Sequence, residues 1–168
     1  MLRPLLTITT LAAALAPAAA AQARPVDIGK TAGPAIERLA HQTTLPVLLP
    51  NIPIDLDIGP KTKVYGSASG DAKSWFVDLA GARHCGANAC FLASFTGEKG
   101  ARLGFRTNVT LATGIRAHYQ PLSCGGSCSP PWIAWRLHGM RYEIQAKTVK
   151  GSKAEFVAYA NSALEGGG

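Results

Sequence analysis

The chain has 168 residues, of which 47% are hydrophobic and 16% are charged, and its formal net charge is +7. This composition excludes a disordered tail, a coiled coil and a collagen-like repeat, because it lacks the charge, heptad or Gly-X-Y bias that each of them needs. A chain of this length and composition predicts one globular domain.

The first 23 residues predict a cleavable signal peptide. Arg3 precedes an apolar run from Leu5 to Ala21, which Pro17 interrupts. The run is too short and too broken to span the ~30 Å hydrocarbon core of a bilayer. Small residues at Ala21-Gln22-Ala23 form an A-x-A cleavage site. These features predict export and cleavage after Ala23.

The sequence predicts three parts in the chain. Residues 1–23 are the signal peptide, residues 24–60 hold an N-terminal helix and a proline-rich segment, and residues 61–168 hold an antiparallel sheet with a C-terminal helix. The mature chain, which begins at Arg24, contains no second apolar run of ~18 residues. We therefore expect no transmembrane segment in it and a periplasmic or secreted location.

The N-terminal segment predicts one short helix followed by irregular chain. Pro34 suits the first position of a helix, and apolar residues follow at helical spacing to about Gln42. Five prolines or glycines then punctuate residues 45–60. This segment has room only for brief extended pieces such as Val47–Leu49, at an edge or in a linker.

Seven later segments have the composition and alternation of β-strands. They are Lys63–Ser67, Ser74–Leu79, Cys90–Phe95, Asn108–Leu111, Ile115–Gln120, Trp132–Leu137 and Met140–Lys147. The connections at Ala112-Thr113-Gly114 and His138-Gly139 have hairpin length. Such short turns predict antiparallel order.

The C-terminal segment predicts an amphipathic helix that ends at the terminal glycines. Ser152 and Glu155 form a capping box ahead of an apolar stripe that begins at Phe156. An isolated helix of this length is marginal in water, so its stripe must pack on a sheet. The predicted fold class is α+β, a single domain with an antiparallel sheet of six or seven strands and both helices on one face.

Strand alternation predicts which side chains the helices cover. The inward residues are Ile115, Ala117, Tyr119, Ile133, Trp135, Leu137, Met140, Tyr142, Ile144 and Ala146. The outward residues are Arg116, His118, Gln120, Arg136, Arg141, Glu143, Gln145 and Lys147.

The four cysteines form two closely spaced pairs, and an oxidising compartment favours disulfides between them. Glycines within Cys85–Cys90 and Cys124–Cys128 permit a sharp chain reversal. We predict the local bridges Cys85 with Cys90 and Cys124 with Cys128, which shape loops more than they hold the fold.

A metal or thiol-exchange site is the alternative interpretation of the same cysteines. His84 beside Cys85, or His118 near Cys124, could supply a nitrogen ligand. The C-x4-C spacing does not match a usual zinc site, and neither pair precedes a helix as a thioredoxin motif does.

Part of the chain resembles a known family. The run from Val109 to Tyr119, the pattern Ile133-x-Trp135 with Tyr142-x-Ile144, and a final helix ending Tyr159–Leu164 are similar to the C-terminal part of the DUF4367 family. The resemblance covers about 60 of the 168 residues and departs from the family at the cysteine loops. It implies an extracytoplasmic bacterial domain without an assigned catalytic residue set.

Motifs of catalysis are absent from the sequence. The segment from Gly66 to Gly70 places Ala68 where a G-x-S-x-G motif needs serine, and neither S-x-x-K nor H-E-x-x-H occurs. Asp55 and Asp57 lack a third acidic or amide partner, so we interpret them as solvated. We expect no enzymatic activity, no cofactor and no metal.

Charge is distributed unevenly along the C-terminal half. Nine cations face a single anion, Glu143, from residue 99 to residue 153. The cations are Lys99, Arg102, Arg106, Arg116, Arg136, Arg141, Lys147, Lys150 and Lys153. If their strands are neighbours, Arg116, Arg136, Arg141 and Lys147 meet an anionic envelope component or an acidic protein. Nucleic acid is not expected, because the outward face shows no interleaved aromatic residues.

The sequence therefore predicts a small exported binding or accessory protein without catalytic activity. The alternative is a periplasmic thiol-redox or metal-binding protein that uses the Cys85/Cys90 and Cys124/Cys128 loops.

Overall fold

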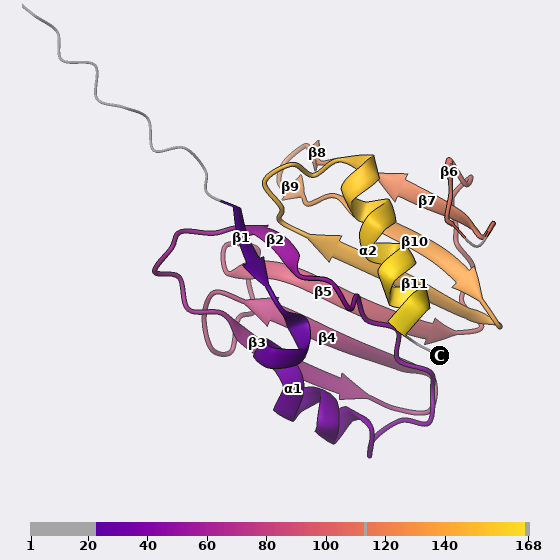
Figure 1. Ribbon diagram of the computed structural model, residues 1–168, viewed down its shortest axis with the longest axis horizontal. Helices are drawn as coiled ribbons and strands as arrows, with labels where there is room; N and C mark the ends of the chain where they lie inside the picture. The colour runs from indigo at the N-terminus through magenta and orange to yellow at the C-terminus, as the bar shows by residue number, and fades with distance from the viewer. Residues whose placement is uncertain (1–22, 113, 167–168) are drawn as a thin grey trace, which may run out of the picture.

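Seven strands form the main sheet of the protein. The computed structural model describes residues 23–112 and 114–166. The strands are β3 (Tyr65–Gly70), β4 (Ser74–Ala80), β5 (Phe91–Lys99), β6 (Val109–Thr110), β7 (Arg116–Gln120), β10 (Trp132–Leu137) and β11 (Met140–Ala146). Their order is β3-β4-β5-β11-β10-β7-β6, and every neighbouring pair is antiparallel (Figure 1). Each predicted strand is present, with ends shifted by a few residues.

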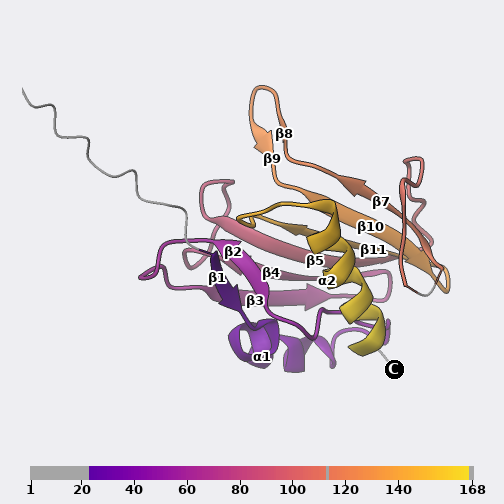
Figure 2. The ribbon, with the colours of Figure 1, turned by 45° about the horizontal axis from the view of Figure 1, so that its top comes forward.

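Two helices, α1 (Ile28–Leu39) and α2 (Lys153–Gly166), lie on the same side of this sheet (Figures 1 and 2). Helix α1 packs on β3 and β4, and α2 packs on β7, β10 and β11. The largest side chains buried between the layers are Trp75, Phe95, Trp135, Tyr142 and Phe156. The predicted α+β fold, with both helices on one face, is confirmed.

Helix α1 begins earlier than the sequence predicts. The Asp27 side chain accepts a hydrogen bond from the Lys30 backbone N–H at 2.9 Å and so caps a helix that starts at Ile28. Pro34 lies inside the helix instead of at its first position. Because proline has no backbone N–H, the Lys30 carbonyl lacks its usual helical hydrogen bond. Lys30 is exposed, so water can supply that hydrogen bond.

Glycine in β3 allows α1 to approach the sheet closely. A Cβ atom on Gly66 would lie 2.5 Å from the Ala32 Cβ and 2.6 Å from the Ala32 Cα. Because both of those atoms belong to a packed helix, they have no room to move aside. Gly66 is therefore required for the contact between the first helix and the sheet edge.

The predicted capping box of α2 is confirmed. The Glu155 N–H donates to the Ser152 hydroxyl, and the Ser152 N–H donates to the Glu155 carboxylate, each at 3.3 Å. The same carboxylate accepts a bond from the Tyr159 hydroxyl at 2.9 Å. The start of α2 is thus fixed by side chains of its own first turns.

A second, two-stranded sheet lies between the helices (Figure 1). It pairs β1 (Ala23–Val26) with β2 (Ile54–Asp57), and Leu56 of β2 forms a bridge with Thr148 after β11. Residues 45–60 do hold only a brief strand, but it is β2, at Ile54–Asp57, and not the example Val47–Leu49. Pro53 directly precedes β2 and leaves its ladder intact, and buried Ile54 and Leu56 hold the strand against the core.

The predicted signal peptide lies almost wholly outside the described residues. Only Ala23, its last residue, is described, and it pairs with Asp57. Cleavage after Ala23 stays a prediction. Among the described residues, no helix has the length and hydropathy to cross a membrane.

Both predicted disulfides are present, as Cys85–Cys90 and Cys124–Cys128. The second one joins β8 (Ser123–Cys124) to β9 (Cys128–Ser129), a small hairpin that projects from the body of the protein (Figure 2). Residues 121–129 are all exposed. This bridge therefore shapes a protruding arm rather than the core, as the short loop length predicts.

We predict that Gly66→Ala lowers the free energy of unfolding by about 1–3 kcal/mol, because the added methyl group overpacks the contact with Ala32. Urea denaturation followed by circular dichroism measures the change. Gly126→Ala in the exposed arm is the matched control, since a Cβ there meets nothing within 4 Å. A Gly66 variant as stable as the Gly126 variant would contradict the steric argument.

Candidate functional site

The side of the main sheet that faces away from the helices, called here the open face, holds the candidate site. The alternation that the sequence predicts is correct for the three C-terminal strands. Ala117, Tyr119, Ile133, Trp135 and Tyr142 are buried under the helices. The outward residues are not uniformly exposed, however, because His118, Arg141, Glu143 and Gln145 are only partly accessible.

An aromatic cluster covers part of the open face. Phe105, from the loop between β5 and β6, stacks on His118 of β7 with ring centroids 5.0 Å apart, and it contacts Trp132 of β10 at 5.1 Å. Ala134 lies on the same face beside His118 and is fully buried. The expectation that this face lacks aromatic residues is wrong, because Trp132 alternates outward and Phe105 reaches the face from a loop.

The position of His118 fixes its tautomer. Its Nδ1 atom lies 2.7 Å from the carbonyl oxygen of Arg106, so Nδ1 carries the proton and donates. The Nε2 atom is buried and has no hydrogen-bond partner within the described residues. His118 therefore anchors the loop that carries Phe105 and Arg106 to the sheet.

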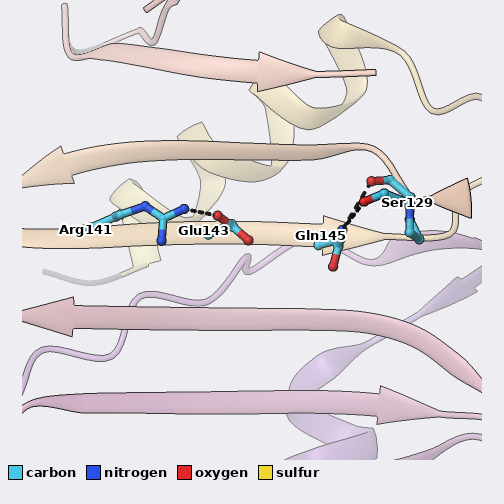
Figure 3. A network of polar contacts seen from close by, with 5 residues as sticks. Ser129, Arg141, Glu143 and Gln145 are labelled. Atoms are coloured by element: carbon cyan, nitrogen blue, oxygen red, sulfur yellow. Dashed lines mark hydrogen bonds and ion pairs between the residues drawn. The ribbon is translucent and has the colours of Figure 1, made fainter. Parts of the chain in front are cut away.

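An ion pair lies on β11 beside this cluster. The Arg141 guanidinium donates to the Glu143 carboxylate, and the two side chains are 22% and 24% exposed (Figure 3). Burial raises the pKa of Glu143, and the Arg141 charge opposes that rise. Gln145 continues the polar line and donates to the Ser129 hydroxyl at 3.2 Å.

Three arginines line up across neighbouring strands, and we call them the arginine row. Arg136 of β10 is paired directly with Arg141 of β11. Trp135 is paired with Ala117 of the antiparallel β7, so Arg136, which follows Trp135, and Arg116, which precedes Ala117, lie beside each other. Arg116 and Arg136 are exposed and form no salt bridge within the described chain. The row ends at Glu98 of β5, which is the cross-strand partner of Arg141.

The structure separates Lys147 from the arginine row. Lys147 follows the opposite end of β11, where its ammonium group contacts the Asn88 carbonyl and lies 5.9 Å from the centroid of the Phe91 ring. Lys147 therefore fastens the loop that contains the Cys85–Cys90 disulfide. The four cations that the sequence groups together occupy two ends of one face.

Asp78 of β4 is a half-buried carboxylate at the same end as that loop. It lies opposite Ser67 of β3 and Ser94 of β5. Burial raises the pKa of Asp78, and a hydrogen bond from the Ser94 hydroxyl partly offsets that rise. Asp78 forms no salt bridge with any other described residue. A partly desolvated charge without a counter-ion lies in the position where a ligand could neutralise it.

The cysteines supply no free thiol in this state of the protein. All four form disulfides. No group of three or more His, Cys, Asp or Glu side chains gathers in a metal-binding arrangement among the residues described. His84 lies in the first disulfide loop and adopts a positive φ of 53°.

Sequence reasoning missed Phe105, Asp78 and Glu98 as residues of the open face. Asp78 and Glu98 do alternate outward within β4 and β5, so strand periodicity contains the signal for both. Phe105 follows Gly104 in a loop without periodicity. Only the folded structure brings it onto His118 and Trp132.

Comparisons of the whole chain with protein-family models, with curated proteins and with solved structures find no match. The geometry of the open face therefore has to support any proposal about function.

We predict that Asp78→Asn stabilises the protein at pH 7, by no more than about 1 kcal/mol, because the carboxylate is half-buried and water screens its charge. A raised pKa in the folded state means that ionisation opposes folding. This penalty is absent below the unfolded pKa, grows as the pH rises through the folded pKa, and is complete above it.

Urea denaturation between about pH 3.5 and pH 7 measures this dependence. Asp71→Asn is the control of opposite sign, since hydrogen bonds from the Lys73 and Ser74 N–H groups lower the pKa of Asp71. That variant should lose stability at neutral pH. An Asp78 variant whose gain is the same at both ends of the range would show that burial of charge is not its cause.

Proposed function

We propose that this protein is an exported binding or accessory protein without catalytic activity, which contacts an anionic envelope component through the open face. The observation that carries the proposal is the arginine row. Two exposed guanidinium groups, Arg116 and Arg136, lie on adjacent strands of the sheet and have no acidic partner in the part of the chain that the structure describes.

The arrangement of charge on the row favours an external anion. Arg141 is neutralised by Glu143 and lies beside Glu98, so it contributes little free charge. Arg116 is held in place by bonds from its guanidinium to the Thr107 side chain and carbonyl, at 3.3 and 3.5 Å. A planar, pre-positioned guanidinium loses less freedom when it binds a carboxylate or a phosphate.

The aromatic cluster gives the same surface an apolar part. Phe105 is 52% exposed and is one of the few large apolar side chains that reach solvent. It lies over His118, which is two residues along β7 from Arg116. A partner that carries both anionic groups and apolar surface would gain from both features.

The location in the cell is part of this proposal. Two disulfides support an oxidising compartment. The predicted signal peptide supports export, and cleavage after Ala23 would leave Arg24, Pro25 and Val26 of β1 paired with β2.

We predict that the double variant Arg116→Glu/Arg136→Glu weakens association with anionic vesicles at least about tenfold, since each basic residue near an anionic surface contributes ~1 kcal/mol. Sedimentation with phosphatidylglycerol vesicles measures the association, and neutral phosphatidylcholine vesicles give the background. Binding by the parent should decline as salt shortens the Debye length to ~8 Å at 0.15 M.

Lys61→Glu/Lys150→Glu is the matched control, because it changes the net charge equally at two exposed residues outside the row. Surface changes of this kind alter stability by only about 0.5 kcal/mol each. The proposal fails if both double variants bind equally, or if the parent binds the anionic vesicles no better than the neutral ones. If the parent binds an acidic protein more tightly than it binds the vesicles, the anionic partner is a protein and not a membrane component.

Export has its own test. Intact-mass measurement of the protein purified from its native cell envelope should give a chain that begins at Arg24 and is four hydrogens lighter than its reduced form, as two disulfides require. A chain that keeps Met1, or one with four free thiols, contradicts the proposed location.

A further inference from the structure

A cleft of about 490 Å³ opens between the β3–β4 hairpin and the first disulfide loop. It lies at the end of the open face opposite the arginine row. The residues that line it include Tyr65, Ser67, Asp78, Arg83, Asn88 and Phe91. Its volume falls within the range of small-molecule sites.

The walls of this cleft are fixed before any ligand arrives. The Cys85–Cys90 disulfide closes the loop, and the Gly81 N–H donates to the Cys90 carbonyl at 2.8 Å. Lys147 holds the loop from outside through the Asn88 carbonyl. A pre-formed site of this kind avoids the entropy cost of ordering a loop on binding.

Opposite charges lie on two walls of the cleft without neutralising each other. Asp78 accepts a bond from Ser94 and has no cationic partner among the described residues. The Arg83 guanidinium lies 5.0 Å from the centroid of the Tyr65 ring and forms no salt bridge in the described structure. A ligand with one positive and one negative group would form an ion pair with each of these two side chains.

The cleft limits that ligand to a small molecule, because both charged side chains line one volume of about 490 Å³. Asp78 is paired with Ser67, so it is a diagonal neighbour of Tyr65, and such neighbours in a sheet lie ~7–8 Å apart. The Arg83 guanidinium lies 5.0 Å from the centroid of the Tyr65 ring, so the carboxylate and the guanidinium line the same cleft from neighbouring positions.

A free α-amino acid carries one positive and one negative group within a small molecule. Backbone bond lengths of ~1.2–1.5 Å place its ammonium nitrogen and carboxylate oxygens about 3 Å apart, whereas a dipeptide separates its charged ends by an additional residue. We propose that the cleft binds a free α-amino acid, with its ammonium group on Asp78 and its carboxylate on Arg83. Its side chain then lies against the Tyr65 and Phe91 rings.

The experiment is calorimetric titration of the full chain with L-phenylalanine, after a thermal-shift survey of the twenty common amino acids. Two blocked probes accompany it: N-acetyl-L-phenylalanine, which lacks the ammonium group, and L-phenylalanine amide, which lacks the carboxylate. We expect both blocked probes to bind at least about tenfold more weakly, because each leaves one charged group of the cleft unpaired.

Variants assign each end of the ligand. Asp78→Asn should weaken L-phenylalanine binding about tenfold and change the binding of N-acetyl-L-phenylalanine little. Arg83→Gln should likewise weaken L-phenylalanine binding about tenfold and change the binding of L-phenylalanine amide little. Glu37→Gln and Arg38→Gln are the matched controls, because both residues are exposed on α1 away from the cleft. They should bind L-phenylalanine as the parent does.

The proposal is overturned if the survey finds no amino acid that binds, if the blocked probes bind as tightly as the free one, or if Asp78→Asn binds unchanged. Arg116→Glu/Arg136→Glu should retain amino-acid binding, because the arginine row lies at the other end of the face. That variant separates this cleft from the proposed contact with the envelope, so either idea can fail without the other.

Discussion

Burial of one face of the main sheet is the constraint on which the rest of the structure depends. Helices α1 and α2 and the β1–β2 pair all pack on that face, where Trp75, Trp135 and Tyr142 fill the interior. Two helices are needed because the sheet is seven strands wide, and each covers one half of it. No described helix or strand forms a layer over the other face, so its exposed charges and rings can make contacts outside the molecule (Figure 2).

The sequence predicts the fold well, because period-two alternation and turn residues are local signals. His138 and Gly139, for example, both adopt positive φ in the turn that joins β10 to β11, as a two-residue hairpin requires. The start of α1 is harder to predict, since the Asp27 cap and an internal proline give opposite indications. Buried Ile54 and Leu56 likewise form β2 against the local signal of the surrounding prolines.

The candidate site is predicted only in part, because it depends on which strands become neighbours. Alternation places Arg116, Arg136 and Arg141 outward, but the pairing of Arg141 with Glu98 joins strands far apart in the sequence. The ion pair between Arg141 and Glu143 then leaves Arg116 and Arg136 as the two arginines of the row without a salt bridge among the described residues. The cleft depends equally on tertiary structure, since Asp78 and Arg83 acquire their roles through the position of the disulfide loop.

The order of strands also has a consequence for how the chain folds. Strands β3, β4 and β5 follow one another in the chain and are neighbours in the sheet, and the same holds for β7, β10 and β11. The two halves meet along β5 and β11, where Lys99 pairs with Met140 at one end and Ala93 with Ala146 at the other. When β5 pairs with β11, the chain between Lys99 and Met140 is closed into a long loop. Closing that loop costs conformational entropy that the strand pairings within each half do not cost. The docking of β5 on β11 is therefore the step expected to limit the folding rate, and side chains at that seam should govern kinetics more than those at the sheet edges.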